Sequence, residues 1–75
     1  IPPNIKHLQH LSDERMANAL RFWLKTSHQS TPSTAQLAEL MAQIRSCTTR
    51  GHKMHIKVGH GFVERKAACI DWYNP

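Results

Sequence analysis

Residues 11–24, LSDERMANALRFWL, decide how the rest of this chain folds. Ser12 can cap a helix because its hydroxyl accepts from the backbone N–H groups that open the helix. Asp13 and Glu14 then place negative charge at the positive end of the helix dipole. At about 100° per residue, the apolar side chains gather on one side of this segment. The stretch therefore predicts an amphipathic helix. Its apolar stripe is Met16, Leu20, Trp23 and Leu24.

The opposite side of this predicted helix is basic and carries one aromatic ring. Arg15, Arg21 and Lys25 lie there near Phe22. Two interpretations of Phe22 stay open, because its ring suits stacking on a ligand as well as packing over the N-terminal segment.

The flanking segments predict two further helical pieces. Residues 1–10, IPPNIKHLQH, begin with a proline pair and then space apolar residues by three, which favours an extended start and a short helical turn. Residues 26–32, TSHQSTP, predict a loop. Ser33 and Gln36 match a capping box and open a second helix. Its apolar face is Leu37, Leu40, Met41 and Ile44.

The periodicity changes from helix to strand after Gly51. Apolar and polar residues alternate in residues 53–58, KMHIKV, and Gly59, His60 and Gly61 predict a tight hairpin. Residues 62–66 are predicted to form the second, returning strand of the hairpin, and residues 67–73 a third strand. The expected fold class is α+β: two or three N-terminal helices followed by a small antiparallel β-meander, in one domain over residues 1–75.

Composition indicates the charge of the partner and the cellular compartment of the protein. The 75 residues carry ten Lys and Arg against five Asp and Glu, for a net charge of +5, which favours an anionic partner. Two cysteines are too few for a disulfide framework, and no apolar run approaches the roughly 20 residues that cross a bilayer. We expect a soluble, cytoplasmic protein without a membrane partner.

The chain offers no constellation for catalysis. It lacks a Gly-rich phosphate loop and a nucleophile elbow, so we assign no catalytic residue. Cys47 or Cys69 could form a catalytic pair with any of six histidines, but one sequence does not show that a cysteine and a histidine lie close together. A zinc site from Cys47, His52, His55 and Cys69 fits no standard finger spacing. His7 and His10 lack nearby ligands, so no metal is assigned.

The remaining feature is a distributed basic surface. Single-stranded and folded RNA are bound by cations at the phosphates and by flat side chains beside unpaired bases. The predicted RNA-binding residues are Arg15, Arg21, Phe22, Lys25, Arg50, Lys53, Lys57, Arg65 and Lys66.

Three segments together resemble a known family. They are LSDERMANALRFWL, TPSTAQLAELMAQI and HIKVGHGFVERKAACIDW, and they are similar to the substrate-recognition domain of bacterial tRNA(Ile)-lysidine synthetase. The residues that match its pattern are Leu11, Ser12, Arg15, Asn18, Leu20, Arg21, Trp23, Leu24, Pro32, Ser33, Leu37, Leu40 and Arg65. The chain departs from the pattern at Phe22, where the family has a second Arg, and at Lys66 and Ala67, which replace an aromatic residue and an Arg.

The resemblance implies a longer parent enzyme, which the start at Ile1 also suggests. That parent would use ATP to adenylate the wobble cytidine of an isoleucine tRNA, and lysine would then displace AMP. The family's ATP-pyrophosphatase loop is absent here, so the resemblance places ATP, Mg and lysine in an upstream domain. This segment would hold tRNA(Ile) and contact other domains, with no cofactor of its own.

Two alternatives belong to other classes. Helices followed by a β-hairpin can form a winged-helix-like DNA-binding module. A structural docking domain would instead bury Phe22 and Trp72 against a neighbouring domain.

Overall fold

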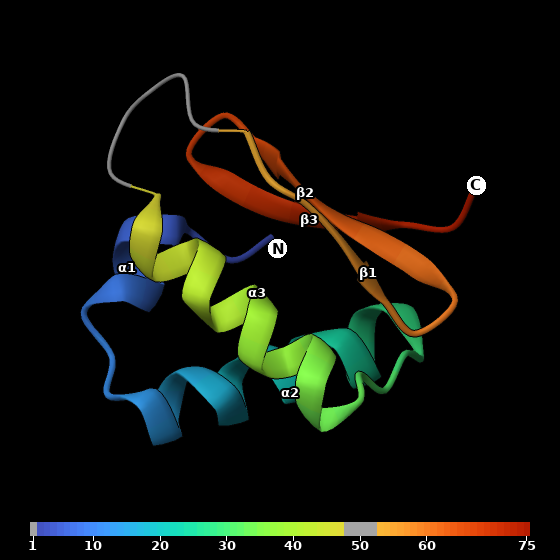
Figure 1. Cartoon of the computed structure of the whole chain (residues 1–75), viewed down its shortest axis with the longest axis horizontal. Helices are drawn as coiled ribbons and strands as arrows, with labels where there is room; N and C mark the ends of the chain where they lie inside the picture. Colours follow the sequence, from blue (N-terminus) through green and yellow to red (C-terminus); the bar gives the residue numbers. More distant parts are fainter. Residues whose placement is uncertain (1, 48–52) are drawn as a thin grey trace.

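A computed structural model describes residues 2–47 and 53–75, in which three helices precede three strands (Figure 1). This confirms the α+β prediction. The helices are α1 (Ile5–Gln9), α2 (Asp13–His28) and α3 (Thr34–Ser46), and the strands are β1 (His55–Val58), β2 (Gly61–Lys66) and β3 (Cys69–Tyr73).

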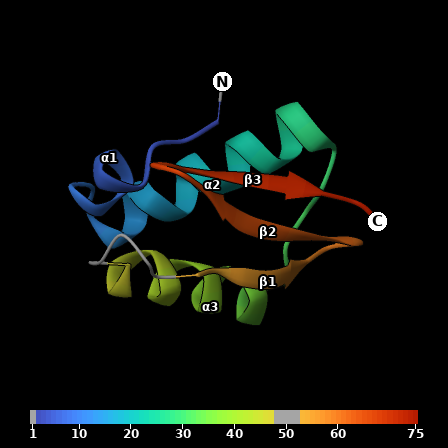
Figure 2. The ribbon, with the colours of Figure 1, turned by 90° about the horizontal axis from the view of Figure 1, so that it is seen from above.

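The strands form an antiparallel sheet in the order β1-β2-β3, and the helices lie against one of its faces (Figures 1 and 2). Val63 in the central strand lies opposite Ile56 on one side and Trp72 on the other. The N-terminal segment runs beside β3, where Ile5 N donates to Ala68 O at 2.9 Å. One face of the sheet therefore closes the core, and no helix of residues 2–47 and 53–75 lies over the other face.

One hydrophobic core joins all six elements. Met16, Leu20 and Leu24 from α2 are fully buried, as are Leu40 and Ile44 from α3. The predicted apolar stripe is thus confirmed, and Trp23 belongs to the core as expected. From the sheet and the other segments, the core takes Ile5, Leu8, Leu37, Cys47, Met54, Ile56, Val58, Val63 and Ile70.

Helix α2 begins where the sequence predicts and ends later. The Ser12 hydroxyl accepts from Arg15 N, which confirms the cap. The prediction of a loop from residue 26 is wrong, since the helix continues to His28 and Gln29 caps it with a left-handed φ of 49°. Thr26 bonds its hydroxyl back to Phe22 O at 2.7 Å, so a polar side chain fits inside the last turn without breaking the backbone ladder.

Helix α3 has the predicted capping box, in which Ser33 and Gln36 each satisfy a backbone donor of the other. At its other end, the Arg45 guanidinium donates to Gln9 O and to Leu11 O at 2.6 Å each, and it pairs with Asp13 at 2.9 Å. Arg45 thereby ties α3 to the corner between α1 and α2.

Two turns connect the strands. Gly59 has a φ of +62°, as the predicted first hairpin requires. A Cβ added at Gly59 would meet Ser30 Oγ, so this turn packs tightly on the α2–α3 connection. The second turn corrects a prediction: Ala67 and Ala68 lie in the turn rather than in the third strand, and Ala67 has a φ of 57°. No Gly or Asn marks that turn in the sequence.

Among residues 2–47 and 53–75, none of the helices combines the length and the apolar character that a membrane span needs.

We predict that Leu20→Ala lowers the free energy of unfolding by about 2–5 kcal/mol, because it leaves a cavity in a fully buried part of the core. Phe22→Ala, two residues away on the exposed side of the same helix, should change it by about 0.5 kcal/mol or less. Urea unfolding followed by circular dichroism measures both. Equal losses for the two variants would contradict the packing of α2.

We predict that Gly59→Ala lowers the free energy of unfolding by about 1–3 kcal/mol, because a Cβ is unfavourable at this φ and also meets Ser30 Oγ. Repeating the substitution in a Ser30→Ala background separates the two causes, because the hydroxyl is then gone. A smaller loss in that background, again by urea unfolding, shows the steric part. The same loss in both backgrounds would leave the backbone conformation as its only cause.

Candidate nucleic-acid interface

The exposed side of α2 carries four of the predicted binding residues together: Arg15, Arg21, Phe22 and Lys25. At about 100° per residue they fall within an arc of about 120°, directly opposite the buried stripe. Phe22 is 70% exposed, so it does not cover the N-terminal segment. A flat apolar ring thus stands among three cations on one helix face.

These cations are available for a ligand. Within the described part of the chain, no carboxylate forms an ion pair with Arg15, Arg21 or Lys25. Arg21 Nη1 makes a long contact of 3.5 Å with Asn18 Oδ1 on the same face. Binding an anion here would therefore not require breaking an existing salt bridge.

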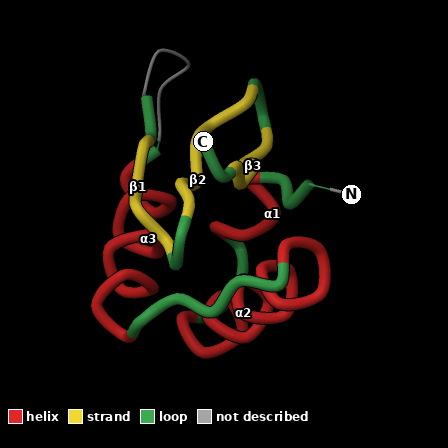
Figure 3. The backbone as a smooth tube through the Cα atoms, turned by 90° about the vertical axis from the view of Figure 1, so that its right-hand side faces the viewer, coloured by secondary structure: helices red, strands yellow, loops and turns green. Residues whose placement is uncertain are grey.

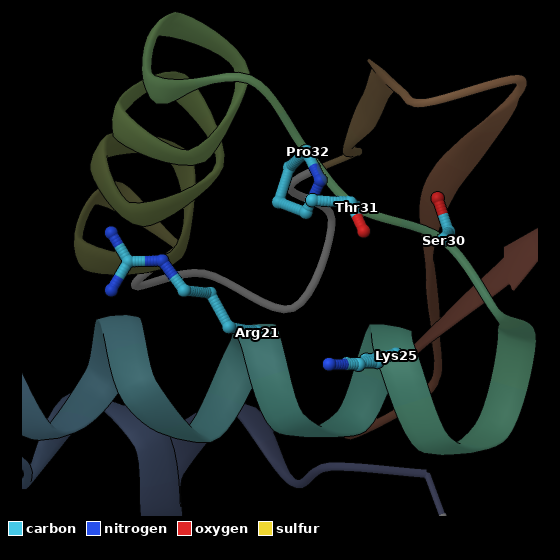
Figure 4. A pocket seen from close by; sticks show the side chains of 5 residues that line it. All are labelled: Arg21, Lys25, Ser30, Thr31 and Pro32. Carbon is cyan, nitrogen blue, oxygen red and sulfur yellow. The ribbon is translucent and has the colours of Figure 1, made fainter.

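A pocket opens between this face and the α2–α3 connection (Figure 4). Its volume is about 240 Å³, and its lining is Arg21, Lys25, Ser30, Thr31 and Pro32. Arg21 and Lys25 come from successive turns of α2, and the other three residues approach from the connection. Two cations beside one pocket give a site whose chemistry suits a phosphate group. The Ser30 hydroxyl points away from them and packs toward Gly59.

Sequence reasoning missed the contribution of Ser30 and Thr31. It treated residues 26–32 as a polar loop, and nothing in their order shows that this loop turns back beside α2. Ser30 is only 7% exposed, and its backbone N–H donates to Leu24 O. The burial of Ser30 would have indicated that this connection packs beside α2, but burial cannot be read from the sequence.

A second group of predicted residues lies on the sheet. Lys57 in β1 and Lys66 in β2 point away from the core, and the exposed Lys53 precedes β1. Strand β1 is shorter than the predicted residues 53–58, because regular pairing begins at His55. Lys66 Nζ lies 4.0 Å from Asp71 Oδ2, so part of its charge is balanced.

Arg65 occupies a different position from the other cations. It lies on the helix-facing side of β2, where Nε donates to Ala67 O at 2.8 Å and Nη1 contacts Cys47 Sγ at 3.3 Å. These bonds connect the second turn and the end of α3, so much of this side chain serves the fold. Arg50 lies outside the described residues.

The α2 cations and the sheet cations do not form one patch. Helix α2 and the open face of the sheet lie on opposite sides of the core (Figures 1 and 3). The predicted binding residues therefore divide into a helix surface, defined as Arg15, Arg21, Phe22 and Lys25, and a sheet surface that includes Lys53, Lys57 and Lys66.

The next feature is the placement of the side chains that could bind a metal ion or react as thiols. Over residues 2–47 and 53–75, His, Cys, Asp and Glu nowhere gather in threes that could hold a metal ion. Cys47 is buried and Cys69 half-buried, and both are free thiols. The zinc alternative also needs His52, which lies outside the described residues.

Comparisons with known proteins agree with the resemblance seen in the sequence. The TilS substrate binding domain matches residues 4–70. A tRNA(Ile)-lysidine synthase of Polaromonas naphthalenivorans (strain CJ2) is 55% identical over 69 residues, which are 92% of this chain and 21% of that protein. A tRNA(Ile)-lysidine synthase of Bordetella pertussis is 42% identical over 50 residues, which are 67% of this chain and 16% of that protein. Among solved structures, none matches.

The chain thus spans about a fifth of the length of the curated relatives it matches. The family match covers all three helices and the first two strands. This chain belongs to the TilS substrate binding domain family.

Proposed function

We propose that this chain is the tRNA-recognition part of a tRNA(Ile)-lysidine synthase and that it holds an isoleucine tRNA through the helix surface. The observation that carries the proposal is the set of three cations around the exposed ring of Phe22, none of which forms an ion pair with a carboxylate of the described residues. Family membership and the names of the relatives support the same substrate class.

The helix surface suits folded RNA for two reasons. Arg15, Arg21 and Lys25 can each neutralise a backbone phosphate, and the pocket beside Arg21 and Lys25 brings two of these cations to one hollow. The ring of Phe22 can cover a sugar or an unpaired base. Affinity would come from the phosphates, while the shape of the surface would select among folded RNAs.

In this proposal, the chemistry takes place elsewhere in a longer enzyme. That enzyme would activate the wobble cytidine with ATP and join lysine to it, in the cytoplasm. ATP, Mg²⁺ and lysine are assigned to an upstream domain, since this chain spans only about a fifth of the length of the curated relatives. This chain would contribute binding and position only.

A winged-helix-like DNA binder is less well supported. The helix before the strands, α3, would have to read the groove. Its exposed side chains include Thr34 and Glu39. Its basic residue Arg45 is already bonded to Leu11 O and Asp13. Few groups on α3 are left to contact phosphates or base edges.

We predict that neutralising two cations, in Arg21→Gln with Lys25→Gln, weakens binding of an isoleucine tRNA transcript and flattens its salt dependence. Each lost phosphate contact should reduce the slope of log K against log salt by about 0.7–0.9, so the pair should reduce it by about 1.4–1.8. Fluorescence anisotropy across a series of salt concentrations measures both quantities.

Two single variants give the matched control. Lys25→Gln and Lys6→Gln remove the same charge from exposed helix positions, but Lys6 lies on α1 and outside the helix surface. Lys25→Gln should weaken binding more than Lys6→Gln does. Equal effects would mean that net charge, rather than the helix surface, attracts the tRNA, and an unchanged slope in the double variant would remove α2 from the interface.

A further inference from the structure

Three aromatic rings gather on the open face of the sheet, on the side away from the core. The rings of His55 and Phe62 are stacked, with centroids 4.5 Å apart and an interplanar angle of 15°. Tyr73 joins them from β3, with its hydroxyl 2.8 Å from His55 Nε2 and its centroid 5.8 Å from that of Phe62. We call His55, Phe62 and Tyr73 the ring cluster.

The ring cluster takes one member from each strand, because the register places neighbouring strand positions side by side. Phe62 lies opposite Tyr73 across the β2–β3 pair, and His55 lies diagonally from Phe62 across the β1–β2 pair. All three belong to the face opposite the buried Val63. The cluster therefore sits on a rigid sheet, and it is not part of the core.

The three rings stay partly open to solvent, although the chain buries most of its large apolar side chains. Tyr73 is 36% exposed, His55 is exposed and Phe62 is half-buried. No helix among the described elements lies over this face of the sheet (Figures 2 and 3). A cluster of partly exposed rings on one face offers a surface on which a flat ligand can stack.

The charges around the ring cluster favour a nucleotide as its partner. Lys57 lies directly opposite Phe62, and the exposed Lys53 precedes His55 by two residues, so cations lie close to the rings along β1. Glu64 lies opposite His55 and offers an acceptor for an exocyclic amino group. Rings for a base and cations for its phosphates are the parts that single-strand binding uses.

We propose that the ring cluster stacks an unpaired base of a single-stranded RNA segment, with Lys53 and Lys57 contacting its phosphates. Strand β1 is an edge of the sheet, so a single strand can approach His55 from that side. A duplex hides the faces of its bases and cannot use the rings. The proposal rests on the proposed function, because it assigns a second surface to the same RNA-binding domain.

The experiment titrates the 75-residue chain, which has its own closed core, with an octamer of cytidine and separately with the isoleucine tRNA transcript. Cytidine carries the exocyclic amino group that Glu64 can accept from. NMR follows the ring signals of the cluster. We expect the octamer to shift the signals of His55, Phe62 and Tyr73. Phe62→Leu should weaken octamer binding about fivefold or more, since it removes a stacking ring.

A conservative substitution at the same position is the control. Phe62→Tyr keeps a ring and should bind the octamer within about twofold of the unsubstituted chain, whereas Phe62→Leu keeps only the apolar volume. If Phe62→Leu fails to fold, Tyr73→Leu at the exposed end of β3 tests the same ring cluster. It is likewise expected to weaken octamer binding about fivefold or more.

The outcomes separate this proposal from the proposed function. Suppose that the chain binds tRNA but that the octamer shifts no ring signal, or that Phe62→Leu binds the octamer as tightly as the unsubstituted chain. Either result would overturn the role of the ring cluster and leave the proposed function standing. Ring shifts from the octamer without tRNA binding would support the cluster and reject the proposed function. Ring signals that respond only to another domain of the parent enzyme would show a protein-docking face and overturn the proposal.

Discussion

Burial of one stripe of α2 is the constraint on which the rest of the structure depends. Met16, Leu20 and Leu24 lose all contact with solvent, and they bring α3 and the sheet onto the same helix. Because a domain of this size buries only about 60% of its unfolded surface, its stability margin is small, and loss of this stripe would remove a large part of the core. The same burial fixes which side of α2 faces outward, so the packing of the core determines where Arg21 and Phe22 point.

The basic residues of the chain divide according to what they contact. Arg45 and Arg65 donate to backbone carbonyls, and these bonds hold the ends of α3 and β2 in place. Arg15, Arg21 and Lys25 have no such structural task among the described contacts and stand on an exposed helix face. A count of positive charge treats these residues alike, but binding an anion at the second set breaks no ion pair among the described residues, whereas Arg45 would have to give up its pairing with Asp13.

The sequence predicted what depends on near neighbours. The Ser12 cap, the capping box of Ser33 and the alternation in β1 are local patterns, and the structure has all three. Features that depend on distant contacts were missed or misplaced. The end of α2 at His28 and the turn at Ala67 carry no strong local signal.

The same limit applies to the candidate site. Periodicity could place Arg21, Phe22 and Lys25 on one face of a helix, because that needs only the helical repeat. It could not show that Ser30 lines a pocket beside them, or that β1, which carries Lys57, lies across the core from α2. Both facts depend on how the elements pack. The principal axes of the molecule span 28, 27 and 24 Å, so a straight duplex lying on the helix surface would not also reach the rings of the sheet. If both surfaces bind RNA, they must therefore bind different parts of it, with backbone phosphates at α2 and an unpaired base at the ring cluster.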